Sequence, residues 1–218
     1  MGDSESTEMY IKTIFELDGG DEQVAISRIA ERLGVSTVSA TEMMKRLAER
    51  DLLVHTPYKG VQLTATGRRR ALHVVRRHRL WECFLMDQLD IPWEKTHEYA
   101  CQLEHSTADE VVESLAAFLG NPATCPHGNP IPTAEGELAD LHDVPLSEME
   151  VGAAGRIARI FREETTLLEY LGERGLYPGM PLRVEDIAPY NGPMTLLVDG
   201  TEHILGRGIA AHIWVNLD

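Results

Sequence analysis

The nine residues from His97 to His105 carry the side chains best suited to chemistry in this chain. They read His-Glu-Tyr-Ala-Cys-Gln-Leu-Glu-His, in a segment expected to form a helix over 94–106. At about 100° per residue, four metal-capable side chains fall within roughly one third of a turn: His97, Cys101, Glu104 and His105. Imidazole, thiolate and carboxylate together favour a transition metal over calcium or magnesium. An incidental polar face explains this stripe less well.

A second pair of possible ligands lies earlier in the chain. His78 and Glu82 are four residues apart in a long helix expected over 67–89, so they share one face. Alone, such a pair is more often a surface hydrogen bond than a site. One metal cannot easily take ligands from all six side chains of the pair and the stripe, but two neighbouring metals can. Two sites are therefore predicted.

Basic residues are concentrated between Lys45 and Arg79. This segment holds ten Lys or Arg and only two acids, a local net charge of +8, in a chain of 218 residues whose net charge is −15. The remaining residues hold ten bases and 33 acids. A basic segment on an acidic body attracts phosphate while the rest of the surface resists indiscriminate contact. A solvated helix face would also explain the segment taken alone.

The elements around the basic segment favour DNA binding. A helix is expected over 6–17, followed by a turn at 18–21. Ser27 is the expected cap of a short helix that stops at Gly34, and Ser36 caps a second helix that runs to about Arg50. Two short strands are expected between 52 and 63. This order is typical of a winged helix-turn-helix that binds double-stranded operator DNA.

The expected DNA contacts follow from side-chain chemistry. Small hydroxyl residues at the start of the second helix can enter a major groove, Val38 or Ala40 can meet a thymine methyl, and basic side chains bind phosphates. Glu42 can accept from a cytosine amino group or simply face solvent. The DNA-binding residues predicted on these grounds are Ser36, Thr37, Ser39, Lys45, Arg46, Arg50 and Lys59.

The rest of the chain divides into a helical part and a β-rich part. Thr66 is the expected cap of the long helix, and Thr107 with Glu110 forms a capping box for a helix that ends near Gly120. Five prolines mark a connector over 121–147. From about residue 148, four short β patterns interrupted by a helix near 161–171 suit a small SH3-like barrel.

Composition limits the cellular setting. No run approaches the roughly 18 apolar residues of a membrane span, and no export leader precedes the first helix. The cysteines, Cys83, Cys101 and Cys125, are odd in number and far apart, so free thiols or metal ligands are expected in place of disulfides. A soluble, cytoplasmic protein is predicted.

Taken in order, these motifs resemble the diphtheria-toxin-repressor family of iron- and manganese-dependent transcriptional repressors. The likeness extends over nearly the whole chain. The matching stretches are Thr7-Glu-Met-Tyr10 with Ile14, Arg77-His-Arg-Leu80 with Glu82, the stripe from His97 to His105, Gly128-Asn-Pro-Ile-Pro132 and Leu176-Tyr-Pro-Gly179. Each is weak alone, and the ordered set is highly specific.

The resemblance implies a mainly α protein of three domains that acts as a homodimer. A winged helix-turn-helix domain is expected over 1–72, a helical metal-binding and dimerisation domain over 73–140, and a connector with an SH3-like (FeoA-like) β-barrel over 141–218. The implied primary metal ligands are Met9, Cys101, Glu104 and His105. The implied ancillary ligands are His78, Glu82, His97 and Glu164. Leu167 replaces a glutamine that often assists the ancillary site, and Glu163 is a nearby carboxylate that could substitute.

The ligand types bear on the identity of the corepressor. Met9 and Cys101 offer soft sulfur donors where manganese-selective relatives carry carboxylates, which favours Fe(II). Mn(II) can still serve in the cell, since metal supply as well as ligands determines occupancy. The expected cofactor is Fe(II) or Mn(II), with two sites per subunit.

Two other functions compete with a repressor. Cys101-x-x-Glu104-His105 resembles an inverted zinc-peptidase signature with its first His replaced, in which the Glu would act as general base. That reading leaves the basic segment and the His78/Glu82 pair unexplained, so no enzyme is expected. A metal buffer would bind metal equally well but would have no specific affinity for DNA.

Overall fold

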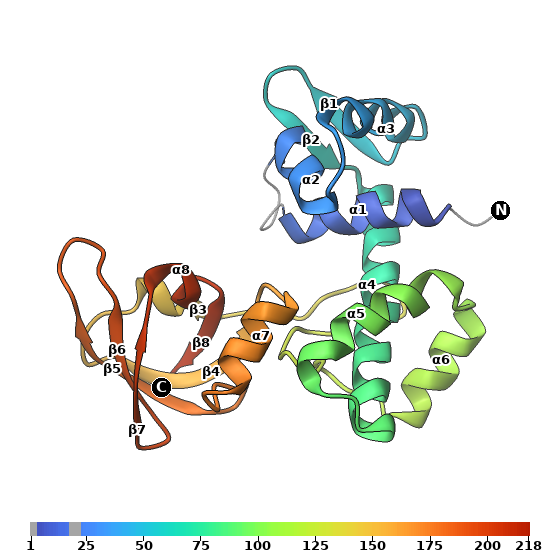
Figure 1. Ribbon diagram of the computed structural model, residues 1–218. Coiled ribbons are helices and arrows are strands. Elements are labelled where there is room, and N and C mark those ends of the chain that lie inside the picture. The colour runs from blue at the N-terminus through green and yellow to red at the C-terminus, as the bar shows by residue number, and fades with distance from the viewer. Residues whose placement is uncertain (1–3, 18–22) are drawn as a thin grey trace. The chain divides into compact units, whose positions relative to one another are not determined.

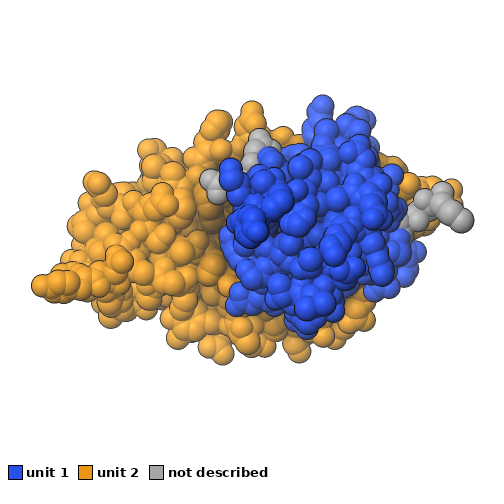
Figure 2. Space-filling view, turned by 90° about the horizontal axis from the view of Figure 1, so that it is seen from above, with its two compact units in different colours: residues 1–77, 104–106, 132–137 blue, residues 78–103, 107–131, 138–218 orange. Residues whose placement is uncertain are grey.

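The computed structural model describes residues 4–17 and 23–218, so the turn expected at 18–21 lies outside the described residues. Contacts divide the chain into two compact units (Figure 2). Unit 1 contains residues 1–77, 104–106 and 132–137, and unit 2 contains the remainder. No helix in the described part of the chain is long and apolar enough to cross a membrane.

Unit 1 is built on three helices and a hairpin (Figure 1). In order, these are α1 Glu5–Leu17, α2 Ile26–Leu33, α3 Thr37–Glu49, β1 Leu53–Thr56 and β2 Gly60–Leu63. Ile11, Ile14 and Leu47 are fully buried in their common core. The arrangement confirms a helix-turn-helix followed by a two-stranded wing.

Two local signals explain the turn between α2 and α3. Gly34 has a φ of 64°, a left-handed conformation that glycine adopts without the steric cost of a Cβ, and it ends α2. Ser36 accepts a hydrogen bond from the backbone N–H of Ser39 and begins α3. The expected cap at Ser27 is wrong by two residues, because α2 begins at Ile26 after Ala25.

The long helix α4, Ala65–Leu89, runs through both units. Its cap is Thr64, whose hydroxyl accepts from the backbone N–H of Gly67 at 3.0 Å, and not the expected Thr66. The helices that follow it are α5 Trp93–Leu103, the 3-10 helix η1 Glu104–Ser106 and α6 Asp109–Phe118. The single helix expected over 94–106 therefore changes hydrogen-bonding pattern at Glu104.

The capping box expected at the start of α6 is wrong. The hydroxyl of Thr107 donates to the carbonyl of Leu103 at 2.7 Å and accepts from Trp81 Nε1 at 2.8 Å. Ala108 occupies the cap position of α6 with no side-chain hydrogen bond. A contact with a distant tryptophan thus competes with the local motif.

The C-terminal part of unit 2 is an antiparallel sheet of six strands in the order β3-β8-β4-β5-β6-β7. The strands are β3 Val144–Pro145, β4 Ala154–Ile160, β5 Pro181–Ile187, β6 Met194–Val198, β7 Thr201–Leu205 and β8 Ile213–Leu217, with α7 at Thr165–Gly172 and α8 at Arg207–Ala210. Among the described strands no pairing joins β3 to β7, so the sheet is open and the expected barrel closure is not seen.

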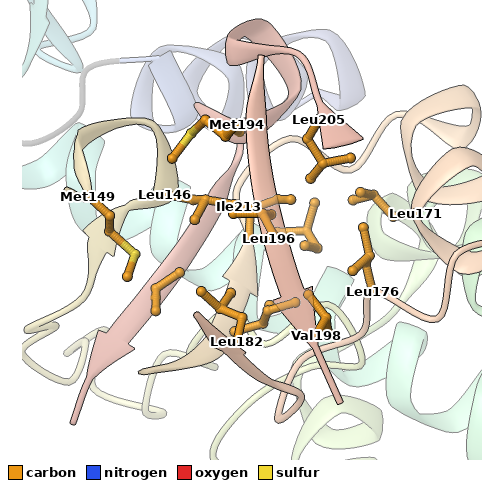
Figure 3. Packing of buried hydrophobic residues seen from close by; sticks show 14 of the residues in the cluster. Leu146, Met149, Leu171, Leu176, Leu182, Met194, Leu196, Val198, Leu205 and Ile213 are labelled. Atoms are coloured by element: carbon orange, nitrogen blue, oxygen red, sulfur yellow. The ribbon is translucent and has the colours of Figure 1, made fainter. Parts of the chain in front are cut away.

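One core joins this sheet to the helices. Leu146, Leu171, Leu196 and Ile213 lie among its buried side chains (Figure 3). Trp93, at the start of α5, belongs to the same cluster, and its ring centroid lies 4.9 Å from that of Tyr177. Trp93 anchors α5 in the core of the sheet, and the next turn of α5 brings His97 beside Glu163, shortly after the end of β4.

Candidate metal centre

Four ligand-type side chains converge in unit 2. His78 and Glu82 lie one turn apart on α4, His97 lies on α5 and Glu163 follows β4. His97 Nδ1 is 2.9 Å from Glu163 Oε2, and His78 Nε2 is 3.0 Å from both Glu82 Oε1 and His97 Nδ1. The four ligand atoms all lie within 4.8 Å of one another. Such a group can hold a divalent cation.

The buried carboxylates of Glu82 and Glu163 cost free energy unless a cation balances their charge. Glu82 is fully buried, and its Oε2 has no hydrogen-bond partner. Burial acts to raise the pKa of Glu82, but the charges of His78 and His127 hold it well below its ordinary value. Burial and the neighbouring carboxylate also act to raise the pKa of Glu163, yet hydrogen bonds with His78 and His97 keep it well below its usual range. A buried anion normally needs a paired cation or a metal.

The structure places Glu163, and not the expected Glu164, beside the other three residues of the expected ancillary set. Glu163, the alternative carboxylate, is the residue in the pocket, and Glu164 is not. Glu164 is the cap residue of α7, and its Oε1 accepts from Arg162 Nε at 2.7 Å. Leu167, which replaces the family glutamine, is a partly buried residue of the sheet core. Sequence spacing could not decide which of two adjacent acids faces inward at the end of a strand.

Two further residues lie beside Glu82 and Glu163: Cys125, which was expected only as a free thiol or an unassigned metal ligand, and His127, which was not predicted. Cys125 and His127 are buried, and His127 Nδ1 lies 3.3 Å from Glu82 Oε1. They come from the proline-rich connector, which packs closely on β4 through Gly128, where a Cβ would lie 2.1 Å from the carbonyl oxygen of Ala158. The only signal available in the sequence was the Cys-Pro-His-Gly spacing.

The residues expected at the primary site are divided between the two units. In unit 1, His105 Nδ1 lies 2.8 Å from Glu8 Oε2, and the buried Glu104 is paired with Lys12 at 2.7 Å. Met9, on α1 of the same unit, is 37% exposed. Cys101 belongs to unit 2, where its Sγ lies 3.7 Å from His97 Nε2. Glu104 and His105 thus both have charged protein partners in unit 1.

The raised pKa values of His105 and His97 predict how pH affects the stability of the metal-free protein. Hydrogen bonds with Glu104 and Glu8 raise the pKa of His105 to about 9. Burial acts to lower the pKa of His97, but hydrogen bonds with Cys101, Glu163 and Glu82 raise it to about 11. A histidine whose pKa is higher in the folded than in the unfolded state stabilises the fold fully at pH values below its unfolded pKa, about 6.5. This stabilisation is lost as the pH rises through its pKa in the folded state.

The free energy of unfolding of the chelator-treated protein is therefore expected to fall between pH 6.5 and 9. Urea denaturation at several pH values measures it, and His105→Gln should flatten part of the slope. Stability that rises over this range would contradict the assignment. Metal binding should show the reverse trend, with affinity that increases with pH, because the ligands must lose their protons.

The expected DNA-binding residues lie in unit 1, on the surface. All seven are exposed: Ser36, Thr37, Ser39, Lys45, Arg46, Arg50 and Lys59. Val38 is 75% exposed and can contact a thymine methyl, whereas Ala40 is fully buried and cannot. Glu42 pairs with Lys45 at 2.7 Å along α3, which accounts for this acid on a basic helix. The exposed surface of α3 and the wing thus offers hydroxyl and basic groups together.

A helix-turn-helix with a wing and a buried His/Glu/Cys centre together define the class of metal-responsive DNA-binding proteins. Comparison with known families agrees. Residues 4–61 match the iron dependent repressor N-terminal DNA binding domain, residues 64–133 match the iron dependent repressor metal binding and dimerisation domain, and residues 144–217 match the FeoA domain. The chain belongs to the family of iron-dependent repressors.

Individual relatives extend over almost the whole chain. The iron-dependent repressor IdeR of Mycobacterium tuberculosis is 32% identical over 214 residues, 92% of this chain and 91% of that protein. The diphtheria toxin repressor of Corynebacterium efficiens is 40% identical over 219 residues, 91% of this chain and 93% of that protein. The names of these relatives are those of transcriptional repressors, not of enzymes.

Solved structures show the same architecture. A manganese-dependent transcriptional repressor in complex with manganese superposes with a TM-score of 0.92 at 35% identity, over 97% of this chain and all of that one. The crystal structure of ScaR with bound Zn²⁺ gives a TM-score of 0.85 at 36% identity, over 96% of this chain and 98% of the other. The family resemblance drawn from the motifs is confirmed.

Proposed function

We propose that the protein is a homodimeric repressor that binds operator DNA when Fe(II) or Mn(II) is bound. The observation that carries this is the group of His78, Glu82, His97 and Glu163, all but His97 buried, in a chain whose helix-turn-helix and wing expose basic side chains. The unpartnered Glu82 Oε2 and the nitrogen and oxygen donors around it fit a divalent transition metal. The protein is expected to act in the cytoplasm.

Two metal sites have separate roles in this proposal. The ancillary site uses His78, Glu82, His97 and Glu163. The primary site uses Met9, Cys101, Glu104 and His105, and Glu104 and His105 exchange their protein partners for the metal. Since Met9 lies on α1 of the DNA-binding domain, metal held there favours one arrangement of that domain. It can do so only through a higher affinity for the DNA-competent state.

The donor types support Fe(II) as the physiological metal. Met9 and Cys101 bring sulfur to the primary site, and thioether and thiolate ligands suit softer ions than Mn(II). The ancillary donors, imidazoles and carboxylates, accept either metal. The C-terminal SH3-like part of the chain is proposed to supply Glu163, which follows β4, to the ancillary site.

The function can be tested without knowing the operator. Chelator-treated protein is reloaded with Mn(II), or with Fe(II) anaerobically, and used to select binders from a random pool of double-stranded DNA. Metal-loaded protein should enrich one pseudo-palindromic sequence, as expected for a dimer that reads two half-sites. Metal-loaded protein that enriches no sequence would overturn the proposal and leave a metal buffer as the better reading.

The wing offers a quantitative test of the DNA contacts. Lys59 is exposed between β1 and β2, and Lys59→Ala should weaken binding to the selected DNA. A lost phosphate contact should also make the slope of log affinity against log salt concentration shallower by about 1. Lys95→Ala, an exposed lysine on α5, makes the same change in net charge and serves as the control. Identical slopes for the two variants would contradict a role for the wing.

A further inference from the structure

Glu42 is an acid on the exposed face of α3, the second helix of the helix-turn-helix, and the proposed function leaves it without a role. Val38, Glu42 and Lys45 are spaced by four and three residues, so at about 100° per residue they lie within about 60° of each other around the helix. The buried residues of α3 lie on the opposite face: Ala40, Met44 and Leu47. The stripe of Val38, Glu42 and Lys45 therefore points away from the core of unit 1, toward the side from which DNA would approach.

The hydroxyl side chains at the start of α3 make local hydrogen bonds. Ser36 accepts from the backbone N–H of Ser39, and the hydroxyl oxygens of these two residues lie 2.8 Å apart. Thr41 Oγ1 donates to the carbonyl of Thr37 at 2.7 Å. Glu42 and Lys45 instead extend into solvent, and 57% of each side chain is exposed. These two long side chains are the groups of the stripe that can carry a polar contact to the edge of a base.

Lys45 keeps Glu42 ionised and fixes one of its two oxygens. Lys45 Nζ donates to Glu42 Oε1 at 2.7 Å, and this hydrogen bond and the lysine charge lower the pKa of Glu42. The pair uses Oε1 and leaves Oε2 to accept a hydrogen bond from DNA.

The chemistry of a carboxylate limits what it can contact on DNA. An ionised carboxylate only accepts hydrogen bonds, and phosphates repel it, so Glu42 is unsuited to a backbone contact. In the major groove, the N4 amino group of cytosine is the donor that Glu and Asp bind. Adenine also has an amino group, but the acceptor N7 beside it suits the amide of Asn or Gln. Cytosine is therefore the base that matches Glu42.

We propose that Glu42 selects a cytosine in each half-site of the operator by accepting a hydrogen bond from its N4 amino group in the major groove. The proposal rests on the proposed function, since it requires that α3 binds DNA with sequence specificity. Lys45 balances the charge of the carboxylate close to the phosphates. Because the approach of a carboxylate to DNA is unfavourable except at the matching base, Glu42 contributes to specificity more than to affinity.

Selection from a random pool of double-stranded DNA with full-length, Mn(II)-loaded protein tests the proposal. The wild type should enrich a cytosine at one fixed position of each half-site. Glu42→Gln should enrich an adenine at that position, because an amide can accept from N6 and donate to N7 of adenine. Glu42→Ala should enrich no base there and should keep the rest of the selected sequence. Thermal melting of each variant reports whether it is folded.

The matched control is Glu49→Gln, at an exposed acid in the last turn of α3, which makes the same change in net charge. It should select the same sequence as the wild type, because the N-terminal residues of such a helix contact the bases.

A modified base tests the amino group itself. The selected cytosine is replaced by pyrimidin-2-one, which lacks the N4 amino group. This change should weaken binding of the wild type about tenfold, a loss typical of one mismatched base pair, and should leave binding of Glu42→Ala unchanged.

The outcomes distinguish this proposal from the proposed function. The same base at every position for the wild type and Glu42→Gln would overturn the role of Glu42. Wild-type binding that does not respond to loss of the amino group would overturn the cytosine contact. A wild-type protein that enriches no sequence would overturn the proposed function itself.

Discussion

Replacing Glu82 with glutamine is expected to abolish metal binding in the buried pocket and to destabilise the metal-free protein by about 3 kcal/mol. Glu82 is fully buried and belongs to the group of ligand-type side chains in the pocket. Removing one partner of a buried charge pair costs about 3–5 kcal/mol because the other charge stays buried. The lower value is expected here because Glu163 remains as a second anion.

Two measurements check the Glu82 prediction. Urea denaturation of chelator-treated protein gives the loss in free energy of unfolding, and calorimetric titration with Mn(II) gives the loss of binding. The matched control is Glu98→Gln on α5, whose side chain is exposed, and it should leave both quantities unchanged. A Glu82→Gln protein that takes up metal as the wild type does would contradict the ligand assignment.

Replacing Met9 with leucine is expected to remove most of the stimulation of DNA binding by metal, at least tenfold in Kd. Coupling between an effector and a ligand is typically about 1–3 kcal/mol, or 5- to 150-fold in affinity. Leucine keeps the apolar volume at this 37% exposed position and removes only the sulfur, so little change in stability is expected. The buried pocket should still bind metal, because its ligands are unchanged.

A second substitution at the same position separates loss of a ligand from a packing effect. Met9→Asp supplies a hard oxygen donor in place of the thioether and should restore activation, with preference moved from Fe(II) toward Mn(II). DNA affinity measured with each metal gives the preference. Full activation of Met9→Leu would show that the sulfur is not a ligand.

Local features of the site could be predicted from the sequence. His78 and Glu82 are four residues apart on one helix, so helical geometry alone places them on one face. The same reasoning placed His97 on the stripe, and Trp93 in the sheet core fixes how this part of α5 meets the end of β4. The helix-turn-helix was equally predictable, since Gly34 and Ser36 determine its turn locally.

Features that depend on distant contacts could not be predicted. Which of Glu163 and Glu164 faces inward depends on how β4 ends against α5, and the strand pattern leaves this open. Cys125 and His127 reach the pocket only because the connector packs on β4 through Gly128. The capping box at Thr107 failed for the same reason, since its hydroxyl is bonded to Trp81.

The expected primary-site residues of unit 1 already have charged partners. In unit 1, Lys12 neutralises Glu104, and both Glu8 and Glu104 contact His105. A metal at the primary site would have to displace these contacts. Release of these contacts when metal binds would couple metal binding to a change in the DNA-binding domain, provided the metal binds more tightly to the changed state.

The most direct test of a metal-activated repressor is the affinity for the selected DNA measured by fluorescence anisotropy at fixed salt. Chelator-treated protein is titrated without metal, with Mn(II), and with Fe(II) under anaerobic conditions. We expect Kd to fall at least tenfold with metal and to return to its metal-free value when excess chelator is added. The same Kd with and without metal would contradict the account.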